Sequence, residues 1–189
     1  MQRYKIVIII SVIVVLLVGY FVFVNKEKAP IVNTYPSIFV INDSDKINSW
    51  NFVGAYSDNL ELQNKSRKEI EELLLKLNDE KQNKFNLNIE IANRYHFLGD
   101  GEKEFYYLSK ALEIDSTNTG LPYHNMGNLM DKIGAYNSAK DAYRKSFDIQ
   151  PLDFYIDTYI EFMKQRFPQE LEEEVLKAKK EVEESKKKI

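Results

Sequence analysis

The chain has 189 residues, of which 26 are Lys or Arg, 29 are Asp or Glu and none is Cys. The absence of cysteine excludes disulfides and a lipid-modified cysteine. The formal net charge of −3 argues against a nucleic-acid-binding surface, which needs a basic face.

An uncharged run lies close to the start of the chain. After a short tail (1–5), residues 6–24 read IVIIISVIVVLLVGYFVFV, and sixteen of these nineteen residues are Ile, Val, Leu or Phe. As a helix this run would extend about 28 Å, close to the roughly 30 Å of a bilayer's hydrocarbon core. The run therefore predicts a single transmembrane anchor.

A cleaved signal peptide is the alternative interpretation of the same run. The run is longer than a typical signal core, and residues 19–25 lack the small residues that a signal peptidase recognises. Basic residues flank both ends, so the positive-inside bias is small. The long segment after the span favours an extracytoplasmic location for the rest of the chain. The Lys, Asn and Ile usage fits an AT-rich bacterial genome, so the expected location is a bacterial inner membrane.

Residues 25–47 are expected to form a linker. Pro30, Pro36 and a polar Asn-Asp-Ser-Asp cluster interrupt regular structure there. The apolar run 38–41 could form a strand, but no partner strand is expected in a helical chain.

Residues 48–84 are expected to hold a partial helical repeat, with helical signals from Ser49 onward. The segment Trp50-x-x-Val53-Gly54 resembles a first helix. A second helix is indicated by an apolar stripe at i, i+3, i+4 and i+7, formed by Ile70, Leu73, Leu74 and Leu77.

Further helices follow from apolar periodicity and from Gly and Pro breaks. They are expected over residues 86–98, 102–114, 122–133, 135–149, 153–166 and 169–189. Residues 85–118 align with residues 120–153 at a period of 35, so that Tyr95 matches Met130 and Gly99 matches Gly134. Two helices per period of this length are typical of an α-solenoid.

The second unit, residues 119–153, has large, small and turn residues at characteristic spacings: Tyr123, Met126, Gly127, Met130, Gly134, Tyr136, Ala139, Tyr143, Ser146 and Pro151. In these residues it resembles the tetratricopeptide repeat (TPR). The first unit, residues 85–118, departs from the pattern at Asn88, Glu104 and Ser116, where a large residue, an alanine and a proline are usual.

The resemblance predicts an all-α fold in which a transmembrane helix precedes a solenoid of TPR-like hairpins. Residues 154–189 would then form a capping helix and a charged terminal helix. The positions expected to pack within and between the hairpins are Ala92, Tyr95, Gly99, Ala111, Tyr123, Met126, Gly127, Met130, Gly134, Ala139, Tyr143 and Pro151.

Catalytic motifs are absent from the sequence, so no enzyme activity and no cofactor is expected. The two histidines, His96 and His124, lie 28 residues apart on the first helices of the two units. A shared metal ion would need more ligands, and Asp131 is the one further candidate. Two ordinary surface or groove histidines are the preferred interpretation, and no metal is expected.

The TPR resemblance implies a concave groove that binds a peptide or a partner helix. The positions that correspond to the groove are Ile89, Asn93, His96, Phe97, His124, Asn128, Asp131 and Lys132. Asn93 and Asn128 match each other, and an asparagine amide can both donate to and accept from a peptide backbone. Ile89 replaces the lysine of the family's carboxylate clamp, which disfavours a chaperone-tail ligand. Alternatively, the two asparagines only cap exposed turns.

A weak heptad seam marks the terminal helix. Its members are Leu171, Val175, Ala178, Val182, Ser185 and Ile189. The sequence thus predicts a single-pass membrane adaptor or scaffold that binds a protein partner through its groove. A self-associating structural membrane protein, with weak homo-oligomers formed through residues 171–189, and an accessory subunit of a membrane enzyme complex remain as alternatives.

Overall fold

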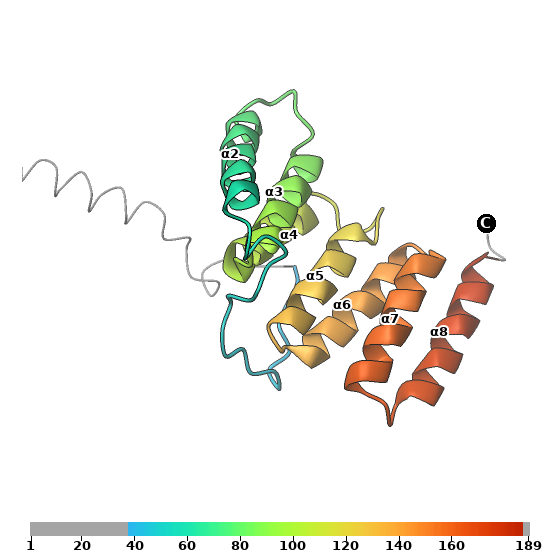
Figure 1. Ribbon diagram of the computed structural model, residues 1–189. Helices are drawn as coiled ribbons and strands as arrows, with labels where there is room; N and C mark the ends of the chain where they lie inside the picture. Colours follow the sequence, from blue (N-terminus) through green and yellow to red (C-terminus); the bar gives the residue numbers. More distant parts are fainter. Residues whose placement is uncertain (1–37, 187–189) are drawn as a thin grey trace, which may run out of the picture. The chain divides into compact units, whose positions relative to one another are not determined.

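The computed structural model describes residues 38–186, which form seven helices and no strand (Figure 1). The helices are α2 (Leu60–Leu77), α3 (Lys84–Leu98), α4 (Gly101–Ile114), α5 (Leu121–Lys132), α6 (Tyr136–Ile149), α7 (Asp153–Arg166) and α8 (Leu171–Lys186). The described part is therefore all-α, as the composition predicts.

The predicted anchor, residues 6–24, lies outside the described residues, and so does most of the predicted linker. Of the helices from α2 to α8, none combines the length and the apolar character that a membrane crossing requires. The membrane anchor therefore stays a prediction from the sequence.

Each helix packs mainly on its neighbours in the sequence. The helix pairs α3–α4 and α5–α6 form two hairpins; α2 lies on α3, α4 on α5, α6 on α7, and α8 on α7 and α6 (Figure 1). The apolar faces of these helices are buried between them, and Leu108, Met126 and Tyr159 are fully inaccessible. An order in which neighbours in sequence are neighbours in space is typical of an α-solenoid.

Glycine at the end of the first helix permits the turn in both hairpins. Gly99 ends α3 with φ +76°, and Gly134 follows α5 with φ +84°, a left-handed conformation that side chains with a Cβ rarely adopt. The two glycines match each other at the period of 35. The repeated sequence thus corresponds to a repeated turn.

A close helix crossing explains Gly127. A Cβ built on Gly127 would lie 2.6 Å from Cδ1 of Tyr143, well inside van der Waals contact. Only glycine lets α5 approach the Tyr143 ring of α6 this closely, and overpacking such a contact is destabilising.

The expectation that helix begins near Ser49 is wrong, because α2 begins only at Leu60. The preceding segment, residues 50–56, instead lies along the α3–α4 turn. Phe52 N donates to the Gly99 carbonyl (3.1 Å), Tyr56 N donates to the Phe97 carbonyl (3.0 Å), and Gly101 N donates to the Trp50 carbonyl (2.9 Å). These bonds hold the segment in a non-helical conformation against the hairpin, so Trp50–Gly54 is not a first repeat helix.

The described part of the predicted linker, residues 38–47, is docked on the helices and forms no strand. Phe39 is buried and its ring contacts Phe105, with centroids 6.4 Å apart. The Asp45 carboxylate accepts from the backbone N–H of Asn137 (3.0 Å) and of Ser138 (2.7 Å) at the start of α6. Helix α6 has no capping side chain of its own, so Asp45, 92 positions before Asn137, fills that role.

The hydrogen bonds at this cap also set the charge of Asp45. Burial acts to raise the pKa of this carboxyl, but the bonds from Ser138 and Asn137 outweigh burial and hold the pKa below its usual value. Asp45 is therefore ionised at neutral pH, where a negative charge at a helix N-terminus is favourable.

Candidate functional site

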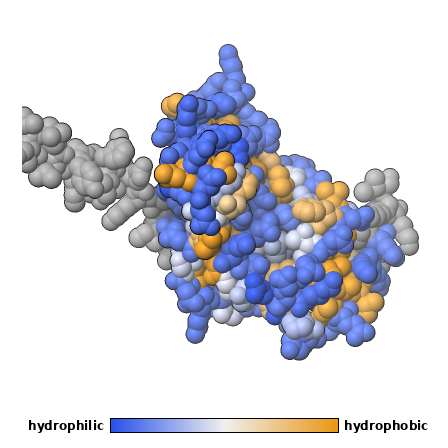
Figure 2. Space-filling model, in the orientation of Figure 1, coloured by the Kyte–Doolittle hydropathy of each residue, from blue (hydrophilic) through white to orange (hydrophobic). Residues whose placement is uncertain are grey.

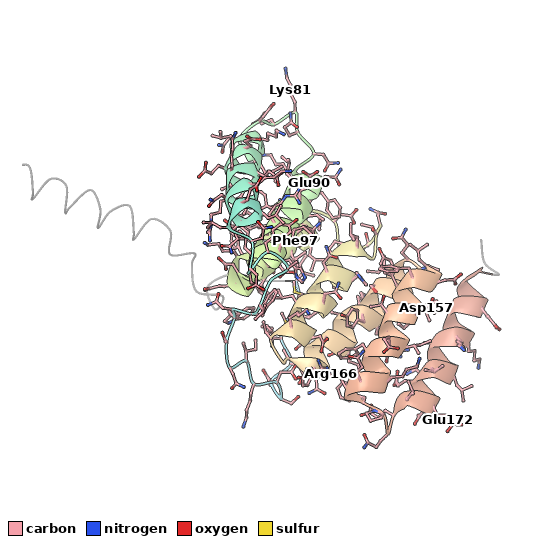
Figure 3. The ribbon with its side chains drawn as sticks, viewed as in Figure 1. Lys81, Glu90, Phe97, Asp157, Arg166 and Glu172 are labelled. Atoms are coloured by element: carbon pink, nitrogen blue, oxygen red, sulfur yellow. The ribbon has the colours of Figure 1, made fainter. Side chains whose placement is uncertain are left out.

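A groove of about 410 Å³ is lined by side chains of α5, α6 and α7. Its lining residues are Asp131, Tyr143, Phe154, Asp157, Thr158, Glu161, Phe162 and Gln165. Six of these residues come from α7 at helical spacing, so one face of that helix forms a wall of the groove. Figure 3 labels Asp157 on this helix. We call this site the α5–α7 groove.

An ion pair joins the two helices beside the groove. The Asp131 carboxylate accepts a hydrogen bond of 2.7 Å from Nε of Arg166, which is labelled in Figure 3. The guanidinium also lies 4.5 Å from the ring centroid of Tyr136, a distance suited to a cation–π contact. Of the candidates from the sequence, Asp131 thus lines the groove but is already paired.

His124 lies beneath the aromatic wall of the groove. Its ring is 4.9 Å from Phe154, 5.1 Å from Tyr155 and 5.7 Å from Tyr143, measured between centroids. Only 6% of the residue is exposed, so His124 cannot face a partner directly. Burial lowers the pKa of His124 to about 4, and the ring is neutral at pH 7. Its Nδ1 has no hydrogen-bond partner within residues 38–186.

Asn128 and Tyr143 form a polar contact next to the groove. The Tyr143 hydroxyl donates to Oδ1 of Asn128 over 2.7 Å. Burial raises the pKa of Tyr143 above its usual value, which keeps the phenol protonated and able to donate. Because the amide oxygen is engaged, the amide NH₂ of Asn128 is the group that could donate to a peptide carbonyl.

The matching Asn93 is used differently. Its Oδ1 accepts a bond of 3.1 Å from Nδ2 of Asn125, which joins α3 to α5. Ile89, one turn earlier on α3, is 6% exposed and belongs to the core. Of the candidates on α3, Asn93 therefore offers its amide NH₂ at an intermediate exposure, and Ile89 offers no surface for a ligand.

The remaining candidates on α3 are covered by the segment 50–56. The Phe97 ring lies 4.9 Å from the Tyr56 ring, and the Phe97 carbonyl accepts from Tyr56 N. The His96 ring lies 5.3 Å from that of Phe52. Lys132, at the end of α5, is exposed. The first hairpin is thus less open to a ligand than the second.

Glu104 has a role that was not predicted from the sequence. This residue is 2% exposed, and its carboxylate oxygens lie 3.0 and 3.1 Å from Nδ1 of His96. Burial raises the pKa of Glu104 above its usual value, while the bond from His96 opposes that rise. The sequence did contain a signal for this contact, because Glu104 stands where the repeat pattern has an alanine. A buried acidic side chain at such a position has to reach a polar partner.

The two histidines have separate surroundings. His96 contacts Glu104, whereas His124 contacts Tyr143, Phe154 and Tyr155. Residues 38–186 contain no group of three or more His, Asp or Glu residues that could hold a metal ion. His96 and His124 therefore have no polar neighbour in common among the contacts described here.

The positions expected to pack the hairpins are mostly interior. Ala92, Ala111, Tyr123, Met126, Met130, Ala139 and Tyr143 are buried, Tyr95 and Pro151 are partly buried, and Gly99, Gly127 and Gly134 have the turn and crossing roles described above. Tyr95 stacks on Tyr107 with ring centroids 5.7 Å apart. Burial raises the pKa of Tyr107 to about 12, in keeping with an interior position.

A second groove of about 560 Å³ lies along α7 and α8. It is lined by Ile160, Lys164, Pro168, Leu171, Glu172, Val175, Leu176 and Lys179. Leu176 is 66% exposed, and Figure 2 shows apolar surface over this end of the helices. Tyr159 and Arg144 both bond to Glu174 of α8, which fixes the helix beside this groove.

Comparison with known proteins finds no family model that matches the chain and no curated protein that matches it. The described residues define an all-α protein of successive helical hairpins with an open groove. The chemistry of that groove and the sequence repeat are therefore the basis for a function.

Proposed function

We propose that this chain is a membrane-anchored, TPR-like adaptor or scaffold that binds a protein partner in a groove between its helices. Residues 6–24 anchor it as a single-pass protein, and its helical part lies on the extracytoplasmic side of a bacterial inner membrane. Its role is to hold that partner beside the membrane, without catalysis, cofactor or nucleic acid.

The α5–α7 groove is the observation that carries this proposal. It presents exposed aromatic, amide and carboxylate side chains together, and Phe154 is 63% exposed at its wall. Exposed apolar area beside convergent polar groups is typical of a surface that recognises a ligand. The groove is open along α7, which suits an extended segment better than a small molecule.

The sequence repeat supports the TPR-like part of the proposal. The two hairpins match at a period of 35 in their turn glycines and in Asn93 and Asn128. Each of these asparagines has its amide oxygen bonded within the protein. Both amide NH₂ groups could then donate to the backbone carbonyls of one bound segment.

Crosslinking in native membranes followed by affinity capture tests the proposal. The full-length chain is compared with Asn93→Ala/Asn128→Ala, which removes both amide donors. Asn64→Ala/Asn86→Ala is the matched control, because it removes two exposed asparagine side chains that line neither groove. A partner that is lost by the double variant and kept by the control supports a groove-dependent adaptor; equal capture by all three overturns it.

The groove along α7 and α8 favours one alternative function, a self-associating structural protein. Leu171, Val175 and Leu176 give this groove an apolar wall on the last described helix. Under this alternative, Leu176→Lys would reduce the oligomeric mass of the full-length chain in detergent, measured by analytical ultracentrifugation. An unchanged monomer in both forms would remove its basis.

A further inference from the structure

The α5–α7 groove contains acidic side chains and no basic ones. Asp131, Asp157 and Glu161 line it, and no Lys or Arg is among its lining residues. Asp131 is paired with Arg166.

Glu161 accepts a hydrogen bond from Nε2 of Gln165 (3.0 Å) and lies 3.5 Å from the Lys164 ammonium, in an exposed pair of the kind that contributes little stability and that a ligand cation can replace. Asp157 makes no ion pair within residues 38–186. Asp157 and Glu161 stand four positions apart on one face of α7 and are exposed.

Aromatic side chains flank these carboxylates. Phe154, Tyr143 and Phe162 line the same groove, and the Tyr143 and Phe162 rings lie 5.1 Å apart. Aromatic faces attract the guanidinium or ammonium group of a ligand and also bury the methylene stem of its side chain. Carboxylates and aromatic faces together select for Arg or Lys beside an apolar residue.

The ring of His124 does not oppose a cation. It packs under Phe154 and is neutral at pH 7 because burial disfavours its charged form. The lining of the groove is therefore acidic at neutral pH, and the basic side chains beside it, Lys164 and Arg166, are paired with Glu161 and Asp131.

The length of the groove suits a short extended segment. Its lining on α7 runs from Phe154 to Gln165, which at the helical rise is about 16 Å. An extended peptide advances about 3.3 Å per residue, so roughly five residues fit along this wall.

We propose that the partner enters the α5–α7 groove as an extended cationic peptide segment, with Arg or Lys side chains on Asp157 and Glu161 and an apolar side chain against Phe154. This inference rests on the proposed function, because it names the chemistry of the partner at the same site. The Asn128 amide next to the groove would bind the peptide backbone, while α7 would select the side chains.

Binding of a synthetic peptide to the full-length chain in detergent tests this inference. The probe is a fluorescent decapeptide of alternating arginine and leucine, measured by fluorescence anisotropy. A second decapeptide has citrulline in place of every arginine, which keeps the shape and removes the charge. We expect the arginine peptide to bind at least tenfold more tightly than the citrulline peptide.

Two double variants of equal charge locate the binding site. Asp157→Asn/Glu161→Gln neutralises the groove, and Glu61→Gln/Glu71→Gln removes two exposed carboxylates from α2, outside the groove. We expect the groove variant to weaken the arginine peptide about five- to tenfold and the α2 variant to weaken it less than twofold. Equal losses would mean attraction by net charge alone and would overturn the inference.

Partner capture in membranes separates this inference from the function on which it rests. If Asn93→Ala/Asn128→Ala loses the partner but Asp157→Asn/Glu161→Gln keeps it, the groove function stands and the cationic ligand is wrong. If neither double variant changes partner capture, the groove function and the cationic ligand are both wrong. If both double variants lose the partner and the arginine peptide binds tightly, both hypotheses are supported.

Discussion

Residues at equivalent positions of the two hairpins make different contacts. At the period of 35, Glu104 matches Ala139 and His96 matches Asp131. In the first hairpin, His96 and Glu104 bond to each other within the hairpin. In the second, Ala139 is fully buried without a polar group, and Asp131 bonds outward to Arg166 of α7.

For the two matching asparagines, the first hairpin makes the contact to a neighbouring hairpin and the second makes an internal contact. Asn93 of the first hairpin bonds across to Asn125 of the second, whereas Asn128 bonds to Tyr143 within its own hairpin. The first hairpin is also covered by residues 50–56. The comparison teaches that a repeated backbone does not imply repeated binding sites: the first hairpin is closed by its own contacts, and the second borders the open groove.

The largest expected loss of stability comes from introducing a buried acid, like Glu104 of the first hairpin, at the matching position 139 of the second. Ala139→Glu would bury a carboxylate at a fully inaccessible position that has no histidine to receive it. We expect a loss of about 3–5 kcal/mol in the free energy of unfolding, measured by urea denaturation. Glu104→Ala, the reverse change, should cost less, because it removes a buried acid together with its bond. A smaller loss for Ala139→Glu would contradict the distinction between the hairpins.

The close crossing in the second hairpin gives the next largest effect. Gly127→Val would drive a branched side chain into the Tyr143 ring, where even a Cβ would lie 2.6 Å from Cδ1. We expect about 3 kcal/mol of destabilisation in thermal or urea unfolding. Gly134→Ala is the control, since no atom lies within 4 Å of its Cβ and only the positive φ is strained. Its cost should be about 1–2 kcal/mol.

Acid should weaken the second hairpin through His124. Its folded pKa of about 4 lies below the unfolded value of 6.5, so its stabilising contribution is full above pH 6.5 and is lost as the pH falls toward 4. Between pH 7 and pH 5 we expect a loss of about 1–2 kcal/mol that is absent from His124→Phe.

Glu104 makes the stability depend on pH in the opposite direction. Its folded pKa is raised, so the stability linked to this group is lost as the pH rises through that pKa and is recovered on acidification. The difference between wild type and His124→Phe isolates the histidine, because both proteins retain Glu104. An identical pH dependence in the two proteins would contradict a neutral, buried His124.

The smallest of these effects concerns the cap on α6. Asp45→Ala removes the acceptor for the backbone N–H groups of Asn137 and Ser138, and we expect a loss of about 1–2 kcal/mol at pH 7. Because the folded pKa of Asp45 is lowered, this contribution is present above about pH 4 and is lost as the pH falls through the folded pKa. Asp43→Ala, an exposed acid on the same segment, should change stability by less than about 0.5 kcal/mol.

Apolar periodicity predicted most of the helices. The helix over residues 153–166 has the predicted bounds, and four others, α3 to α6, begin or end within two residues of them. Local signals suffice for these boundaries because turn glycines and capping residues act within one or two turns. The all-α class follows from the same signals.

The extended segments could not be predicted in this way. Residues 50–56 were expected to be helical, and Asp45 was placed in a linker, yet both act on helices that are distant in the sequence. Their backbone partners, Gly99 and Ser138, are specified only by tertiary contact. The groove shows the same limit, because Asp131 was identified but its neighbours Asp157 and Glu161 on α7 were not.

Site-specific photocrosslinking tests the central claim most directly, namely that a protein partner occupies the α5–α7 groove. A benzoylphenylalanine at Gln165, which lines the groove and is exposed, is compared with one at Lys145, an exposed residue of α6 outside both grooves. We expect a crosslinked partner in native membranes from position 165 and none from position 145. Crosslinks of equal yield from both positions, or from position 145 alone, would contradict it.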